Sequence, residues 1–193
     1  RPDLFRAISY MQGVHTYDLN ENYRNKFNIL KFAKDLIRPT GIPDNSFSMR
    51  KGNGTVMETP FSTTLIIDKL KEEKDFNKWA ILTRTNAEIE NMSALLSRYN
   101  IPFETFKQKD LTREELQEKL VNNTVKILTV HSAKGLEWDN VITIGMRCTP
   151  KEERNVCYVA ATRARENLIW TYTPKKEKPK GRRKKVDKDI VEW

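Results

Sequence analysis

Cysteine, histidine and glycine are scarce in this sequence of 193 residues. The two cysteines, Cys148 and Cys157, lack the CxxC or Cys/His clustering of zinc sites, so we predict neither a structural metal nor a disulfide. No apolar run approaches the roughly 18 residues of a membrane-spanning helix, and residues 1–10, RPDLFRAISY, lack the apolar core of a secretory signal. These absences predict a soluble, cytoplasmic protein.

The sequence also lacks a phosphate-binding loop of the GxxxxGK[ST] type. No acidic pair ends a strand-like segment where a magnesium ion would bind. The first residue is Arg1 and not methionine. We interpret the chain as a segment of a longer protein, although processing or removal of a tag would give the same start.

Positive charge is in excess, because 35 Lys and Arg against 26 Asp and Glu give a net charge of +9. More than half of this excess lies in residues 175–193, which hold nine basic and four acidic residues. We predict that residues 174–193 form a flexible basic tail. Such a tail can bind nucleic-acid phosphates by releasing counterions, but a solvated end and a targeting signal are open alternatives.

Strand-like and helix-like patterns alternate as far as about Thr173, which is typical of a mainly parallel sheet flanked by helices. Short apolar or β-branched runs predict strands, and apolar residues at helical spacing predict helices. We expect strands at residues 79–84, 101–106, 124–130, 141–145 and 167–173, and helices at 85–99 and 111–120. Thr112 and Glu115 form a capping-box pattern in the second of these helices.

The N-terminal third is less regular. Residues 14–19 predict a strand, and residues 63–73 predict a helix. Residues 39–54 hold two prolines and three glycines among polar residues, so they are expected to form a surface loop. An amphipathic helix is expected at residues 27–37, with four apolar side chains inward: Ile29, Leu30, Ala33 and Ile37.

The segment 125–145, VKILTVHSAKGLEWDNVITIG, carries the strongest chemical signal. Its strand is expected to end at Val130, followed by a short helix and Gly135. Ligands of open α/β sheets bind where strands end, so this edge predicts a phosphate-facing loop. The alternative is that His131 caps a turn and Lys134 is solvated. The polar residues at this edge are Thr129, His131, Ser132 and Lys134.

Two further segments place arginines beside predicted helices. In residues 152–170 an apolar helix face of Val156, Val159 and Ala160 precedes Arg163 and Arg165. A guanidinium held there can bind phosphate oxygens in pairs, or it can simply complement the helix dipole.

In residues 20–30, Tyr23 and Arg24 directly precede a helix. An aromatic ring beside an arginine can stack on a base while the guanidinium reaches a phosphate. The same pair also occurs by chance in many surface loops.

Four ordered motifs, NYRN, LTRTN, TVHSAKGLEWDNV and YVAATRARENL, resemble the second motor domain of the superfamily 1 DNA helicases of the UvrD/Rep/PcrA type. The likeness runs from about Leu4 to Thr173. It implies a RecA-like three-layer α/β domain at residues 1–173, the C-terminal motor half of an ATP-dependent helicase that moves 3′ to 5′ on single-stranded DNA. It also implies a bacterial or phage protein associated with the nucleoid.

The resemblance implies a role for each matching residue. In such helicases ATP lies between two RecA-like domains, with its Mg²⁺ held mainly by the first. Arg24 and Arg163 would contact the γ-phosphate, Arg163 as an arginine finger that stabilises the transition state. Tyr23 would stack on the adenine and Glu137 would bind the ribose. The implied single-stranded DNA contacts are Arg84, Asn86, Thr129 and His131.

Departures from the family pattern are also informative. The elements that bind ATP in the first motor domain are missing, and residues 1–13 look like the stretch that follows that domain. Residues 107–124 stand where relatives commonly insert a large accessory domain, so we expect a minimal insertion there; deliberate removal is the alternative. Alone, the chain is expected to bind ATP weakly and not to hydrolyse it. A helicase–nuclease motor and a catalytically degenerate module that binds DNA or a partner stay open as alternatives.

Overall fold

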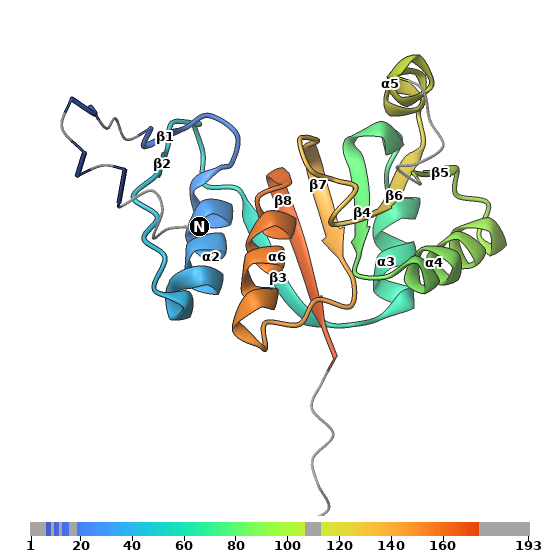
Figure 1. Ribbon diagram of the computed structural model, residues 1–193. Helices are drawn as coiled ribbons and strands as arrows, with labels where there is room; N and C mark the ends of the chain where they lie inside the picture. The colour runs from blue at the N-terminus through green and yellow to red at the C-terminus, as the bar shows by residue number, and fades with distance from the viewer. Residues whose placement is uncertain (1–6, 9, 12, 16–18, 107–112, 174–193) are drawn as a thin grey trace, which may run out of the picture.

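A computed structural model of the chain describes residues 7, 8, 10, 11, 13–15, 19–106 and 113–173. Its centre is a six-stranded sheet in which every pairing between neighbours is parallel (Figure 1). This confirms the predicted α/β fold with a parallel sheet. In spatial order the strands are β3 (Thr55–Pro60), β8 (Ala164–Tyr172), β7 (Trp138–Thr143), β4 (Trp79–Thr83), β6 (Val125–Thr129) and β5 (Phe103–Thr105).

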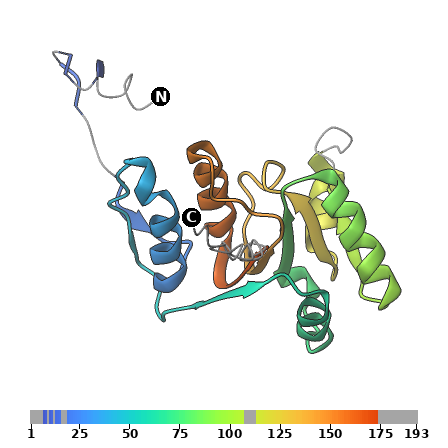
Figure 2. The same ribbon diagram turned by 90° about the horizontal axis from the view of Figure 1, so that it is seen from below.

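Helices cover both faces of the sheet (Figure 2). On one face α2 (Phe27–Ile37) packs against α6 (Lys151–Ala161), and on the other lie α3 (Thr63–Lys71) and α4 (Asn86–Arg98). A further helix, α5 (Arg113–Val121), precedes β6. No helix in the described part of the chain is long and apolar enough to cross a membrane.

The strands form two separate cores because successive side chains point to opposite faces. On β4, Ala80 and Leu82 pack with α2 and α6, whereas Trp79 and Ile81 pack with α3 and α4. All five residues of this strand are buried. A strand covered on both faces has no need of polar residues, which explains the nearly continuous apolar run in the sequence.

Glu88 connects the start of α4 to the end of β7. Its carboxylate accepts hydrogen bonds from the backbone of Arg84 at 2.8 Å and of Thr85 at 2.9 Å, and Thr85 completes a capping box. Gly145 follows β7 with φ +71°, and a Cβ on it would lie 2.0 Å from the Glu88 carboxylate. Because glycine has no Cβ, Gly145 leaves room for the Glu88 carboxylate that caps α4.

Most predicted elements are confirmed. The helix at 27–37 is α2, and its four inward residues are buried. The predicted strands at 79–84, 101–106 and 124–130 are found within a residue or two, whereas β7 and β8 begin three residues earlier than the predictions at 141 and 167. The predicted helix at 63–73 is α3, the one at 85–99 is α4, and the one at 111–120 is represented by α5.

Two predictions need correction, and strand β3 was not predicted. Of the predicted strand at residues 14–19, residues 16–18 lie outside the described residues, and the described ones form no strand. The predicted loop 39–54 contains the end of a 3-10 turn, η1 (Arg38–Thr40), and a short strand, β2 (Phe47–Ser48), which pairs in parallel with β1 (Glu21–Asn22) after the chain has passed through α2. The expected helix after Val130 is a series of turns. The predicted apolar face of α6 is confirmed, because Ala160 is buried in the core with Cys157 and Ala161, and the half-buried Val156 and Val159 pack against that core.

Several predictions lie outside the described residues. Residues 1–6 and the tail at 174–193 are among them, as is Thr112 of the predicted capping box.

The connection from β6 to β7, residues 130–137, passes across β4, which lies between these two strands. It begins where β6 ends and finishes where β7 begins, so it runs from the edge of the sheet at which the strands end to the edge at which they begin. Ala133 is buried in the core on the α2 and α6 side. The segment is short for a parallel crossover, which usually contains a helix.

A fully buried lysine, Lys126, lies on β6 among apolar neighbours. Its ammonium group donates to Glu104 on β5 at 3.0 Å, to the carbonyl of Asn122 at 2.8 Å and to the hydroxyl of Thr124. Burial lowers the pKa of Lys126. Burial raises the pKa of Glu104, but hydrogen bonds from Thr124, Asn122 and Lys126 outweigh this effect and hold the pKa below its usual value.

We expect Glu104→Gln to destabilise the fold by about 2 kcal/mol at pH 7, because it leaves a buried ammonium without its counter-ion. A carboxylate whose pKa is lowered by folding stabilises the protein above its unfolded pKa, and this stabilisation is lost as the pH falls through the folded pKa. The difference between the two proteins should therefore shrink as the pH falls below the usual carboxylate range. Urea unfolding from pH 7 down to pH 3 measures it.

Glu90→Gln is the matched control, because Glu90 is exposed on α4 and takes part in none of the ion pairs of the described residues. Equal unfolding free energies for Glu104→Gln and Glu90→Gln at pH 7 would contradict the assigned role of the Lys126 to Glu104 pair.

Candidate functional site

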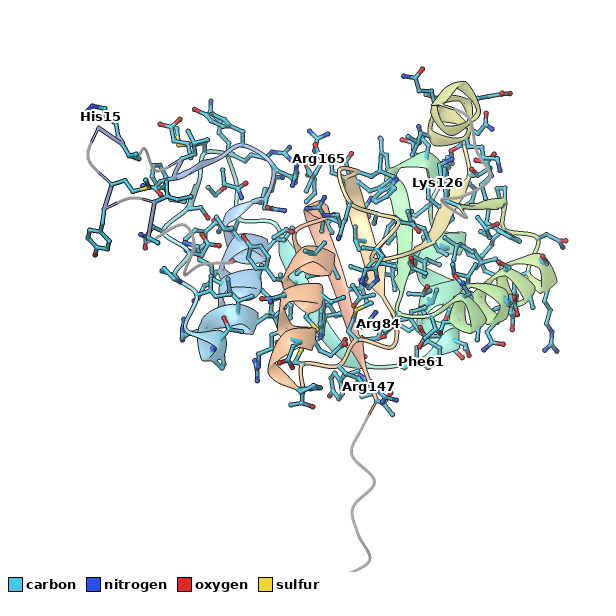
Figure 3. All side chains as sticks on the ribbon, viewed as in Figure 1. His15, Phe61, Arg84, Lys126, Arg147 and Arg165 are labelled. Atoms are coloured by element: carbon cyan, nitrogen blue, oxygen red, sulfur yellow. The ribbon has the colours of Figure 1, made fainter. Side chains whose placement is uncertain are left out.

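The predicted site residues gather at two opposite edges of the sheet. Glu137 precedes β7 and Arg163 precedes β8, so both lie where strands begin, and Arg24, just before α2, pairs with Glu137 there; with Tyr23 we call them the amino-edge group. Arg84, Asn86, Thr129 and His131 lie where β4 and β6 end, and we call them the carboxyl-edge group. Figure 3 shows this separation, with Arg165 of β8 at one edge and Arg84 at the other.

Arg163 is held rigidly by the backbone around it. The side chain is buried, and its guanidinium donates to the carbonyls of Val159 and Leu136, each at 3.1 Å. A weaker bond at 3.4 Å reaches the Thr162 hydroxyl. None of the described residues offers it a carboxylate hydrogen bond. Burial and the nearby charge of Arg24 lower the pKa of Arg163. A buried cation with a second cation close to it favours the approach of an anion.

Arg24 forms an ion pair with Glu137 across the amino edge. Glu137 also lies 3.7 Å from the guanidinium Nε of Arg165, which is equally far from Asp139. That Nε is buried and makes no hydrogen bond within the described part of the chain. The structure therefore brings Arg24, Glu137 and Arg163 together, as the family resemblance implied, with the carboxylates of Glu137 and Asp139 among three arginines.

Asn25, which the sequence reasoning did not single out, fastens the Arg24 loop to the Arg163 loop. It is 1% exposed, and its amide donates to the carbonyl of Thr162 at 3.0 Å and to that of Ala164 at 2.6 Å, the two residues that flank Arg163. Asn22 turns the chain before it by accepting from the backbone N–H groups of Arg24 and Asn25. The sequence signal for these contacts was the motif NYRN, in which an asparagine stands on each side of Tyr23 and Arg24.

Tyr23 extends from this loop and is 67% exposed. Its hydroxyl donates to Glu21, and this hydrogen bond raises the pKa of Tyr23. The exposed ring offers a flat apolar face beside Arg24, and aromatic rings of this kind stack on planar partners.

At the carboxyl edge Arg84 is already paired. Its guanidinium binds Glu153 of α6 in a bidentate manner, at 2.7 and 2.6 Å. This hydrogen bonding raises the pKa of Arg84 and lowers that of Glu153. Arg147 also contributes positive charge near Glu153. The prediction that placed Arg84 in this group did not foresee its acidic partner, because Glu153 is far away in the sequence.

The other residues of the carboxyl-edge group are more accessible. Asn86 is exposed in the first turn of α4, and His131 is exposed directly after β6. Thr129 is half-buried, and its hydroxyl lies 3.1 Å from that of Ser132 and accepts from the Ser132 backbone at 3.2 Å. Thr129 therefore shapes the turn that presents His131.

A cavity of about 360 Å³ opens beside this edge, between the end of β8 and α4. Its floor is apolar, formed in part by Met92 and Ile144, and Phe61 and Tyr172 stand at its rim, each 42% exposed. Figure 3 shows Phe61 on the same side of the molecule as Arg84 and Arg147. Exposed aromatic rings near cations are typical of surfaces that bind single-stranded nucleic acid. The sequence reasoning missed both rings.

Within the described residues no group of three or more His, Cys, Asp or Glu side chains could hold a metal ion. The amino edge instead offers guanidinium groups, an exposed aromatic ring and the Glu137 carboxylate, which fit the phosphates, base and sugar of a nucleotide.

Known proteins resemble this chain in both sequence and structure. The profile of the UvrD-like helicase C-terminal domain matches residues 17–118 and 104–175. The ATP-dependent DNA helicase Rep of Buchnera aphidicola is 36% identical over 77 residues, which is 33% of this chain and 12% of that protein. The F-box DNA helicase protein 1 of Schizosaccharomyces pombe is 33% identical over 126 residues, or 52% of this chain and 14% of that protein.

The ATP-dependent DNA helicase PcrA of Staphylococcus aureus is 37% identical over 73 residues, 30% of this chain and 10% of that protein. The matches thus span between 10% and 14% of the length of these relatives.

A solved structure shares the fold. It is the C-terminal domain of a possible DNA helicase from Lactobacillus plantarum WCFS1, with a TM-score of 0.57, 20% identity, and coverage of 79% of this chain and 88% of that one. With the profile match over most of the sequence, the conclusion is that this chain belongs to the UvrD-like helicase C-terminal domain family.

Proposed function

We propose that this chain is the second motor domain of an ATP-dependent DNA helicase or translocase. The observation that carries the proposal is the convergence of Arg24, Glu137 and Arg163 at one edge of the sheet, with a separate polar and aromatic surface at the other. One edge would contact ATP and the other single-stranded DNA. ATP would lie between this domain and the first motor domain of the same protein, which would hold most of the Mg²⁺ contacts.

At the amino edge Arg163 would bind the γ-phosphate of ATP and act as an arginine finger. Its buried position and its bonds to Val159 and Leu136 orient the planar guanidinium in advance, so little order is lost when a phosphate arrives. Arg24 would exchange Glu137 for the phosphate, and the released Glu137 carboxylate would accept from the ribose hydroxyl groups. Tyr23 would stack on the adenine.

At the carboxyl edge His131, Asn86 and Thr129 would contact single-stranded DNA. Arg84 would join them only by sharing Glu153 or leaving it. Glu153 would therefore compete with DNA phosphates for the Arg84 guanidinium and weaken DNA binding. Phe61 and Tyr172 would offer faces on which unpaired bases stack. The basic tail at 174–193 would add contacts to phosphates.

Residues 130–137 connect the two edges directly. Thr129 and His131 stand at one end of this crossover and Glu137 at the other, and the Leu136 carbonyl accepts from Arg163. Movement of Arg24 or Arg163 onto a phosphate would therefore pull on the segment that presents His131. This link would couple ATP hydrolysis to stepwise movement along DNA, in the 3′ to 5′ direction of related helicases. The protein would act in the cytoplasm, close to the nucleoid of a bacterium or phage host.

Two alternatives stay distinct from this proposal. A helicase–nuclease would need a carboxylate-rich nuclease domain elsewhere in the protein, and a degenerate module that only binds DNA or a partner would have no use for Arg24, Glu137 and Arg163 together. The flanking coding sequence would separate the three: a lysine-containing phosphate-binding loop upstream supports a motor, a carboxylate-rich nuclease domain downstream supports the helicase–nuclease, and the absence of both supports the binding module.

In the full-length protein, Arg163→Ala should lower the DNA-stimulated ATPase kcat by about 10³-fold or more, the usual effect of losing an arginine finger. Arg163→Lys should recover little, because an ammonium lacks the paired donors. Steady-state ATP hydrolysis with saturating oligo-dT gives these rates. The 193-residue chain alone should hydrolyse no ATP.

Arg154→Ala is the matched control, since Arg154 lies on α6, the helix that ends just before Arg163, and also donates to a backbone carbonyl, that of Leu36, at 2.9 Å. Its ATPase rate should stay within about twofold of the parent, as expected for a change away from the reacting groups. An unchanged rate in Arg163→Ala would refute the arginine-finger role.

For DNA, the 193-residue chain should bind labelled oligo-dT, and Glu153→Gln should tighten this binding about threefold because it removes a negative charge beside Arg84 and Arg147. Arg84→Ala should weaken it by about fivefold, roughly 1 kcal/mol. Fluorescence anisotropy at two salt concentrations measures both. Glu72→Gln, at the residue that caps the C-terminal end of α3, is the charge-matched control, and equal affinities for all four proteins would argue against DNA contact at the carboxyl edge.

A further inference from the structure

The two cysteines meet in the fold although the sequence predicted no disulfide. Cys148 lies in the connection between β7 and α6, and Cys157 lies on α6, with their sulfur atoms 3.3 Å apart and hydrogen-bonded. Both are free thiols. A disulfide bond requires the sulfurs to approach to about 2.05 Å, a movement of little more than 1 Å. Since Cys148 belongs to a loop, this movement requires no change in the helix.

The two thiols differ in accessibility. Cys157 is 1% exposed, whereas Cys148 is half-buried and can be reached from solvent. The Cys157 thiol also donates to the carbonyl of Arg147 at 3.2 Å, which keeps it next to the loop that carries Cys148. The accessible Cys148 sulfur is thus placed to react first with a reagent from solvent. The buried Cys157 sulfur is placed to react next, with the modified Cys148.

The charges around the pair agree with this order. The hydrogen bond with Cys157 lowers the pKa of Cys148 to about 7; burial and Glu58 oppose this effect, and Arg154 supports it. The reactive thiolate is therefore populated at neutral pH. The hydrogen bond with Cys148, burial and the negative charge of Cys148 raise the pKa of Cys157. The first and third of these causes disappear once Cys148 is no longer a thiolate.

We propose that Cys148 and Cys157 form a modification site at which a hydroperoxide converts the two thiols into a reversible disulfide. In the first step the Cys148 thiolate attacks one peroxide oxygen, the O–O bond breaks, and a sulfenic acid forms while hydroxide or alkoxide leaves. In the second step the Cys157 sulfur forms the S–S bond and the S–O bond breaks, and water leaves with the proton of Cys157. The thiols lose two electrons to the peroxide, and an added dithiol restores them.

The modification would act on the carboxyl edge. Arg147 precedes Cys148 and lies with Arg84 at the same edge in Figure 3, and its carbonyl would lose the Cys157 donor when the disulfide forms. The bond would tie this segment to the helix that carries Glu153. This proposal rests on the thiol pair and not on the proposed motor function, so each can fail without the other.

The test treats the purified, reduced 193-residue chain with hydrogen peroxide. Because the sequence holds two cysteines, an intramolecular disulfide can only be this pair. We expect the intact mass to fall by two hydrogen atoms, a non-reducing digest to link the peptides of Cys148 and Cys157, and dithiothreitol to reverse both changes. Dimedone, which traps sulfenic acids, should label the unsubstituted chain poorly.

Cys157→Ala is the matched control: its Cys148 should accumulate the dimedone adduct because no second thiol resolves it. Cys148→Ser should show no labelling at the buried Cys157. The proposal is overturned if the unsubstituted chain stays reduced, forms only disulfide-linked dimers, or traps dimedone on Cys148 as readily as Cys157→Ala does. The linked peptide in the unsubstituted chain decides the matter even if a variant folds poorly.

Discussion

The common direction of the six strands decides at which edge of the sheet most candidate site residues lie. In a parallel sheet all strands begin at one edge and end at the other, so residues before strands meet at the first edge and residues after strands at the second. Glu137 and Arg163 belong to the first kind, Arg84 and Thr129 to the second. The crossover 130–137 is the physical connection between the two edges, because β6 and β7 must be joined across β4.

The two edges hold their arginines in opposite electrostatic states. Arg163 is buried, bonded to neutral carbonyl groups and close to another cation, which leaves its charge free for an incoming anion. Arg84 is neutralised by a bidentate carboxylate. Helix α6 participates in both, because it carries Glu153 and ends just before Arg163. Cys157 lies between these positions, so a change in its thiol falls within the element that serves both edges.

Much of the fold could be predicted because its signals are local. The spacing of apolar residues in α2 and α4, and the continuous apolar runs of β4 and β6, directly reflect which side chains must leave water. Strand β3 escaped prediction because it is an edge strand whose side chains are mostly exposed, and it exists only by pairing with β8. The turns after Val130 replace a predicted helix because the crossover must span the sheet in few residues.

The sequence by itself determined the order of the elements, the family motifs and the identities of Arg24, Glu137 and Arg163. It could not show that Asn25 fastens the loops of Arg24 and Arg163 together, or that Arg84 pairs with Glu153. Nor could it show that the two cysteines touch. These contacts join residues far apart in the chain or in different elements, and only the packing of helices on a parallel sheet brings such side chains within hydrogen-bonding distance.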